Sequence, residues 1–303
     1  MGVRKGNQLI GVKCKSFDDF SAIELLPVNL VEVKPHKFEP EKRLYSFDGT
    51  NYFADEQNLS KLAEAADAAG VEVQFHLPDG DFGALLTAAR REHWPRLMNR
   101  LELFSKIVED NGFRREATIH PPWIRLGDLV LSDTPRGLAE GAEFYKQVSQ
   151  AVEDGRIGLR LGVENMGDPH EHSEILGYEF YHFTALLTQA PRIGITFDTG
   201  HRRLSEHLSF RQLLAFLETR NQPDFVTIHF HGNMGRTQFK THEDDVHFVP
   251  DETNVKGYQR HLQRLKEKKT PLVLEVNLDQ FPIDAIRLKL EELWAAAEGR
   301  TVV

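Results

Sequence analysis

Short apolar runs alternate along this chain with longer stretches of helical periodicity. The apolar runs are rich in Val, Ile, Leu and Phe and contain no internal proline, which is typical of strands buried on both faces. We expect eight such strands, at Leu9–Val12, Leu30–Val33, Val71–Phe75, Ala117–Ile119, Gly158–Val163, Ile193–Phe197, Phe225–Phe230 and Leu272–Val276.

A stretch with apolar residues at helical spacing follows each predicted strand. In Pro95–Asn111, for example, Leu97, Leu101 and Phe104 fall on one stripe, and Gly112 marks the end of the helix. Eight strand and helix units predict a parallel barrel, and no glycine-rich phosphate loop follows the first strand, as a dinucleotide-binding sheet would require. The predicted fold is an α/β (β/α)8 TIM barrel in which residues 1–303 form one domain. We expect its helices at Asp18–Leu26, Ser60–Ala69, Pro95–Asn111, Leu138–Asp154, Ser173–Ala190, Phe210–Arg220, Val255–Lys268 and Pro282–Glu298.

The composition fits one large globular core. The chain has 303 residues, of which 40% are hydrophobic, and α/β barrels of this length commonly form a single domain. The net charge of −9 disfavours a general polyanion-binding surface, although a local basic groove would still permit nucleic acid. Cys14 is the single cysteine, so no disulfide can form within the chain, and no apolar run is as long as a membrane span. We therefore expect a cytoplasmic protein with no membrane partner.

Residues that can bind a metal lie at or just beyond the ends of six predicted strands. The carboxyl ends of parallel barrel strands meet at one face, so these side chains converge there. Each residue alone fits a structural role, such as capping a helix or bonding to a loop. Together they would form a ring of carboxylates and imidazoles whose repulsion a divalent cation offsets. The predicted ligands are His76, His120, Glu164, Asp198, His201, His229, Asp245, His247 and Glu275.

Seven short motifs carry a family resemblance over most of the chain, from Leu9 to about Trp294. They are HLP at His76, HPP at His120, VEN at Glu164, FDTGH from Asp198 to His201, IHFH at His229, DVH from Asp245 to His247, and LEV at Glu275. With these motifs the chain resembles the xylose isomerase-like TIM barrels, a superfamily that includes sugar phosphate isomerases and epimerases as well as endonuclease IV. The motifs alone do not show whether the chain catalyses isomerisation or epimerisation of a sugar or the hydrolysis of a phosphoester.

The isomerase and epimerase members imply one divalent ion held by the residues that match Glu164, Asp198, His229 and Glu275. An ion at that position polarises a sugar carbonyl, so a carboxylate can remove the neighbouring proton and form an enediolate. By this resemblance Glu164 and Glu275 act as acid and base, and His201 holds a substrate oxygen. We favour this isomerase or epimerase function.

Endonuclease IV implies the alternative, a zinc-dependent phosphoesterase of AP endonuclease family 2. All nine positions would then hold two or three zinc ions, with His201, Asp245 and His247 around the third. The segment Asp79–Phe82, which follows the first histidine motif, is acidic and unsuited to a phosphate backbone. In addition, Pro250–Glu252 replaces the glycine-rich segment of the endonuclease. These departures disfavour a third ion and DNA binding. A third alternative is a barrel that binds a metabolite or a partner without catalysing a reaction.

The expected ligands follow from these alternatives. We expect one to three divalent ions, with Zn or Mn favoured over Mg or Co, and a small carbohydrate or phosphorylated substrate; a homo-oligomer is left open. Substrate contacts are predicted for His231, Arg236 and Trp123.

Overall fold

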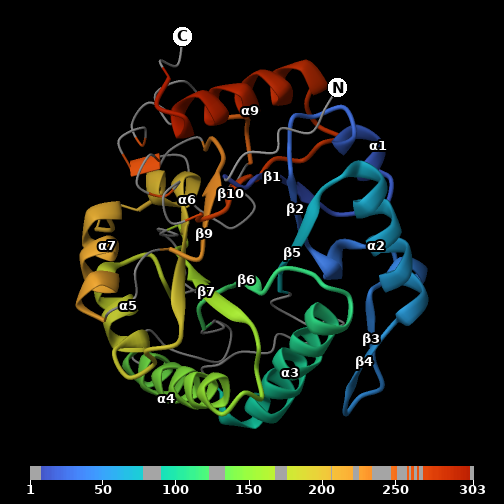
Figure 1. The fold of residues 1–303 in the computed structure, drawn as a ribbon. Coiled ribbons are helices and arrows are strands. Elements are labelled where there is room, and N and C mark those ends of the chain that lie inside the picture. The colour runs from blue at the N-terminus through green and yellow to red at the C-terminus, as the bar shows by residue number, and fades with distance from the viewer. Residues whose placement is uncertain are drawn as a thin grey trace.

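Eight parallel strands close into a barrel in the computed structural model (Figure 1). The structure describes residues 8–77, 90–122, 134–167, 176–205, 207–220, 225–233, 247–250, 258, 261, 262, 265 and 269–300. The order around the barrel is β1-β10-β9-β8-β7-β6-β5-β2, and β1 closes it by pairing with both β2 and β10. The predicted TIM barrel is thereby confirmed. Its strands are β1 (Ile10–Cys14), β2 (Leu30–Val33), β5 (Glu72–His76), β6 (Glu116–Ile119), β7 (Arg160–Glu164), β8 (Gly194–Asp198), β9 (Thr227–Phe230) and β10 (Leu272–Leu274).

Helices surround the barrel on its outer side (Figure 1). Their ends follow the local sequence: Gly70 takes the left-handed conformation after α2, and Ser209 forms a capping box with Gln212 at the start of α7. None of the described helices is both long and apolar enough to cross a membrane. The helices are α1 (Asp19–Ile23), α2 (Glu56–Ala69), α3 (Trp94–Asp110), α4 (Thr134–Glu153), α5 (Phe180–Leu187), α6 (Thr199–Arg203), α7 (Phe210–Thr219) and α9 (Ile283–Ala297), with 3-10 turns at Pro35–Lys37, Pro40–Lys42 and Arg91–His93.

The structure differs from the predicted elements in several places. The connection after β2 holds an antiparallel hairpin, β3 (Tyr45–Phe47) with β4 (Tyr52–Ala54), which we did not predict. Helix α2 starts four residues early because the Asp55 side chain accepts a hydrogen bond from the backbone of Asn58. Helix α5 is shorter than the predicted Ser173–Ala190. Most of the predicted helix Val255–Lys268 lies outside the described residues.

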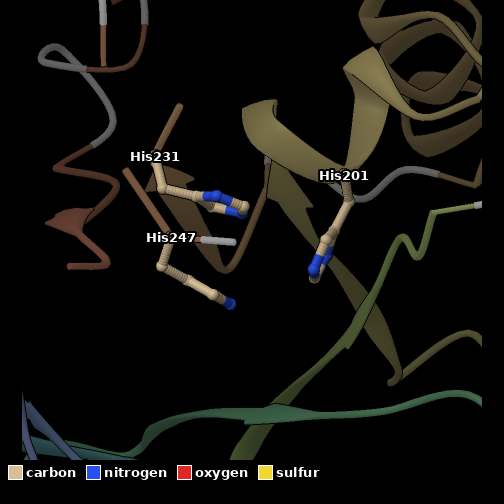
Figure 2. A group of neighbouring side chains, drawn as sticks. All are labelled: His201, His231 and His247. Atoms are coloured by element: carbon tan, nitrogen blue, oxygen red, sulfur yellow. The ribbon is translucent and has the colours of Figure 1, made fainter. Parts of the chain in front are cut away.

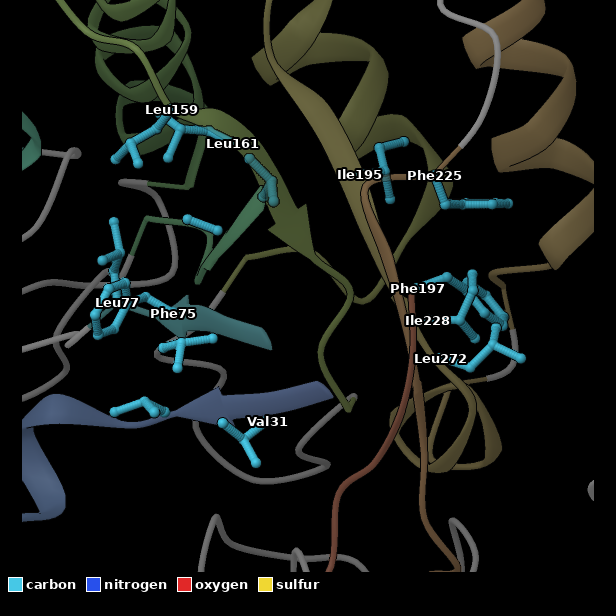
Figure 3. Close-up of a cluster of buried hydrophobic side chains, with 14 of the residues drawn as sticks. Val31, Phe75, Leu77, Leu159, Leu161, Ile195, Phe197, Phe225, Ile228 and Leu272 are labelled. Atoms are coloured by element: carbon cyan, nitrogen blue, oxygen red, sulfur yellow. The ribbon is translucent and has the colours of Figure 1, made fainter. Parts of the chain in front are cut away.

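The apolar core lies between the strands and the helices. The rings of Phe197 on β8 and Phe210 of α7 pack edge to face with their centroids 5.1 Å apart. The rings of Phe75 on β5 and Phe104 of α3 pack in the same way, with centroids 5.3 Å apart. Figure 3 shows Phe75 and Phe197 among the buried side chains of this layer. Because side chains alternate along a strand, the neighbours of these aromatics project into the barrel.

The interior of the barrel contains a polar network besides a small apolar cluster of Leu9, Leu30 and Val273. Gln74 donates to Glu32 at 2.7 Å and to Thr227 at 3.3 Å, and Thr118 and Thr196 share a hydrogen bond of 3.2 Å. All five residues are essentially inaccessible to solvent. Burying so many polar groups is tolerated because they bond to one another. This network forms the floor beneath the residues at the carboxyl ends of the strands.

Candidate metal centre

Three carboxylates and one imidazole meet at the carboxyl ends of four consecutive strands. Glu164 and Asp198 are the last residues of β7 and β8, His229 lies on β9, and Glu275 follows β10. His229 Nδ1 lies 2.7 Å from Glu164 Oε1, 3.1 Å from Glu275 Oε2 and 3.8 Å from Asp198 Oδ2. All four side chains are at most 1% exposed, and each offers one ligand atom within 4.8 Å of the others. This arrangement could hold one divalent ion.

The chemistry of this group fits a cation. Asp198 Oδ2 and Glu275 Oε2 are buried, and neither accepts a hydrogen bond from the residues that the structure describes. A buried carboxylate oxygen without a donor is costly, and coordination to a metal removes that cost. The ligand types, carboxylate oxygen and imidazole nitrogen, suit Mn, Zn or Mg. The residues present therefore fit the predicted ion.

A second group shares Glu164 with the first. His76 Nε2 and His120 Nε2 each lie 3.1 Å from Glu164 Oε2, and the two rings meet edge to face at 5.0 Å. His76 ends β5 and His120 follows β6, so the strand order places them beside β7. These three residues could hold a further ion, with Glu164 as the bridge.

A third group consists of His201, His231 and His247 (Figure 2). The rings of His231 and His247 stack at 4.1 Å, and His231 Nε2 lies 2.9 Å from Asp198 Oδ1. A Cβ at Gly200 would lie 2.2 Å from the ring of His231, so this glycine allows α6 to approach the ring. The structure thus brings His231, predicted as a substrate contact, beside His201 and His247.

Other predicted site residues cannot be placed. Asp245, a predicted ligand of the third ion, lies outside the described residues, as do the predicted substrate contacts Arg236 and Trp123. Of the nine predicted ligands, the other eight meet at one end of the barrel within the three groups. Their assignment as ligands remains a prediction.

The close approach of carboxylates and imidazoles shifts their proton affinities. Burial would lower the pKa of His229, but the charges of Glu32, Glu164 and Glu275 raise it well above its ordinary value. For Glu164, burial would raise the pKa, and the facing His229, His120 and His76 hold it well below the usual range. In the metal-free protein the Glu164 carboxylate is therefore ionised, and the His229 ring is the protonated imidazolium.

Metal binding is expected to release about one proton from His229. A ligand nitrogen needs its lone pair, and the raised pKa keeps His229 protonated at neutral pH, whereas Glu164 is already ionised. The apparent affinity should therefore rise about tenfold from pH 6 to pH 7. Calorimetric titration with Mn²⁺ in two buffers of different ionisation enthalpy measures the released protons. Binding with no proton release would contradict this assignment of His229.

Glu32, which was not predicted as a site residue, lies on β2 behind the metal group. Its carboxylate oxygens lie 3.0 and 3.1 Å from His229 Nε2, on the side of the ring away from Glu164. Burial would raise the pKa of Glu32, and the charge of His229 lowers it. A carboxylate behind a ligand imidazole orients the ring and increases its basicity. The signal was a charged residue inside a buried apolar strand, the Glu in Leu30–Val33.

Two lysines beside Glu275 were also missed. Lys34 Nζ lies 2.6 Å and Lys13 Nζ 3.3 Å from the same oxygen, Glu275 Oε1. Burial lowers the pKa of Lys13 to about 8 in spite of the facing Glu275. Burial would also lower the pKa of Lys34, but the charges of Glu275 and Glu164 raise it above its ordinary value. For Glu275 itself, burial would raise the pKa, and the charges of Lys34 and Lys13 hold it well below the usual range.

Solved structures with a similar fold include several sugar epimerases. A D-tagatose 3-epimerase-like protein is 18% identical, with 96% of this chain and 99% of that chain covered and a TM-score of 0.63. D-Psicose 3-epimerase from Clostridium cellulolyticum H10, solved with D-tagatose, is 9% identical at the same coverage, with a TM-score of 0.61. The 3-keto-D-glucoside 4-epimerase from E. coli is 12% identical over 95% of this chain and 99% of that chain, also at 0.61. At these identities the likeness shows the fold.

Sequence comparison identifies the family directly. No curated protein matches the chain. The family model described as xylose isomerase-like TIM barrel matches residues 20–297, which covers all but the ends of the chain. The predicted resemblance is thereby confirmed, and the chain belongs to the xylose isomerase-like TIM barrel family.

Proposed function

We propose that this protein is a divalent-metal-dependent isomerase or epimerase of a sugar or sugar phosphate. The observation that carries the proposal is the group of Glu164, Asp198, His229 and Glu275, with two buried carboxylate oxygens that lack a donor among the described residues. The names of the similar structures, which are two epimerases and one epimerase-like protein, support the same reaction class. A small carbohydrate is the corresponding substrate.

The reaction that fits this site is proton transfer at the carbon beside a carbonyl. When bound, a divalent ion supplies polarisation of the carbonyl, which acidifies the neighbouring C–H bond. Glu164 and Glu275 enter the site from β7 and β10, on two sides of the group, and both stay ionised because of the cations that face them. Each can therefore remove the proton of the activated C–H bond on its own face of the substrate, which leaves an enediolate, and return a proton to the same carbon.

His201 is positioned to hold a substrate oxygen in this scheme. Its Nδ1 lies 2.9 Å from the backbone carbonyl of Asn165, which places the proton on Nδ1 in the neutral ring. The ring is 3% exposed and stands on α6, whose first turn is capped by Asp198 at 2.6 Å from the backbone of His201. The capped turn fixes the ring relative to the metal group.

One observation favours a second candidate, hydrolysis of a phosphoester. Three ligand groups lie together, and Glu164 belongs to two of them. Several adjacent metal ions would generate hydroxide and stabilise the attacking and leaving oxygens of a displacement at phosphorus. Against this, the chain carries a net charge of −9, which disfavours a nucleic-acid substrate.

Hydrogen exchange in D2O tests the proposed function directly. Protein loaded with Mn²⁺ and incubated with a panel of ketoses and ketose phosphates is expected to incorporate deuterium beside the carbonyl, detected by NMR. Removing the ion with EDTA should stop the exchange, and added Mn²⁺ should restore it. If a phosphodiester is hydrolysed and no ketose exchanges, the second candidate replaces the first.

A further inference from the structure

Three lysines form a row on the first two strands of the barrel. Lys13 lies on β1 and Lys15 follows it by two residues, so both side chains project to the same face of the strand. Lys34 likewise follows the inward-facing Glu32 by two residues and projects inward. The backbone N–H of Lys34 donates to the carbonyl of Cys14 at 3.0 Å, which continues the pairing of β1 and β2 past the end of β2. The three side chains therefore share the mouth of the barrel with the metal group.

The exposure of the three side chains increases toward the mouth. Lys13 is 3% and Lys34 12% exposed, and Lys15 is half-buried. Lys37, which follows in the 3-10 turn after β2, is exposed. Positive charge thus extends from the solvent to Glu275, in a protein whose net charge is −9. A local concentration of one sign in a cleft attracts ligands of the opposite sign.

Several carboxylates face this row, and Glu275, Glu164 and Glu32 all act on the charge of Lys34. Lys13 and Lys34 share a single oxygen, Glu275 Oε1, and Lys15 donates to the neutral side chain of Asn277. The nearby Asp19 accepts from the backbone N–H groups of Lys15 and Ser16, at 2.6 and 3.0 Å. Asp279 is the other carboxylate, besides Glu275, whose charge acts on Lys15, where it opposes the repulsion from Lys34 and Lys37. A divalent ion held by Glu164 and Glu275 would draw on the charge of both carboxylates, which leaves less negative charge to oppose the three ammonium groups.

We propose that Lys13, Lys15 and Lys34 form a subsite for an anionic group, a phosphate or a carboxylate, carried by the substrate. An incoming anion supplies the negative charge that the buried ammonium groups lack once the metal is bound. Ammonium groups are compact charges that serve both phosphate and carboxylate. The inference rests on the proposed function, because it concerns the substrate of that same site, and it narrows the substrate to a charged sugar.

Three matched ketoses test the subsite. D-Fructose, D-fructose 6-phosphate and D-fructuronate carry a hydroxyl, a phosphate and a carboxylate at the same end, and calorimetry on the Mn²⁺-loaded protein gives their Kd values. We expect at least one anionic form to bind about tenfold more tightly than D-fructose, and this preference to shrink with added salt. The preferred anion tells phosphate from carboxylate.

Two charge variants locate the effect. Lys15→Gln is expected to remove most of the preference for the anion while the Kd of D-fructose stays the same. Lys106→Gln, which makes the same charge change on the exposed side of α3, should leave all three Kd values unchanged. No tighter binding of either anionic form, or an equal loss for all three compounds in Lys15→Gln, overturns the subsite. D2O exchange separates the two proposals. Exchange on a ketose without a preference for charged ketoses supports the proposed reaction and refutes the subsite. Tighter binding of a charged ketose without exchange supports the subsite and refutes the proposed reaction.

Discussion

Replacing Glu275 with Gln is expected to lower the rate of hydrogen exchange on a ketose by at least about a thousandfold. In the proposed reaction Glu275 both binds the ion through Oε2 and accepts a proton, and a neutral amide does neither well. The amide oxygen still accepts a hydrogen bond from Lys34, which now lies 2.6 Å from Glu275 Oε1. The variant should therefore fold, with a lower Tm because Lys13 and Lys34 lose their counter-ion. Exchange rates from NMR in D2O measure the effect.

A matched substitution separates chemistry from folding. Glu292→Gln removes a carboxylate that is also nearly buried and paired with a lysine, Lys289 at 2.6 Å, but on the outer helix α9. It should cost some stability and leave the exchange rate unchanged. Near-UV circular dichroism confirms that both variants keep their tertiary structure. Exchange at the full rate in folded Glu275→Gln would refute the proposed role of this residue.

Most of the barrel could be predicted because its strands are buried on both sides and lack breaking residues. The predicted strand Leu30–Val33 matches β2 at both ends, and each of the other seven corresponds to one barrel strand with ends shifted by up to two residues. The hairpin of β3 and β4 escaped prediction because its strands are three residues long, too short to show alternation. Helix α2 begins earlier than predicted because the capping Asp55 precedes the apolar stripe.

The candidate site could be predicted where polar residues follow a strand, since a chemically distinct residue at a strand end stands out. Glu32 and Lys13 lie within strands, between apolar neighbours, and the sequence does not show which side chain of an apolar run faces the interior of a barrel. His231 illustrates the same difficulty. It is separated from His229 by one residue, and only the three-dimensional structure shows its ring stacked on His247.

The two oxygens of Glu275 link these missed residues to the predicted ones. Oε1 faces the ammonium groups of Lys13 and Lys34, whereas Oε2 faces His229 and the proposed ion. A carboxylate between two sets of cations stays ionised and keeps one orientation. The lysines therefore hold Glu275 in place beside the proposed ion, in addition to forming the proposed subsite for an anion.

Replacing Glu32 with Gln is expected to weaken metal binding by about 10- to 100-fold. Glu32 accepts the proton of His229 Nε2, so Nδ1, once it has released its own proton, can direct its lone pair at an ion held with Glu164, Asp198 and Glu275. An amide accepts more weakly, and its NH2 group would face either His229 Nε2, which lies 3.0 Å from Oε1, or the donors Gln74 and Thr118, which lie 2.7 and 3.3 Å from Oε2. Competition for Zn²⁺ with a fluorescent chelator measures the affinity.

The rate at saturating metal distinguishes orientation of the ligand from participation in the chemistry. Glu32 lies behind His229, so Glu32→Gln should keep most of its exchange activity once enough Mn²⁺ is added, unlike Glu275→Gln. Glu116→Gln is the matched control, because Glu116 starts β6 at the opposite end of the barrel and pairs with Arg114 at 3.0 Å. Its metal affinity should equal that of the unmodified protein. An unchanged affinity in Glu32→Gln would mean that His229 does not bind the ion through Nδ1, and the four-residue group would have to be reassigned.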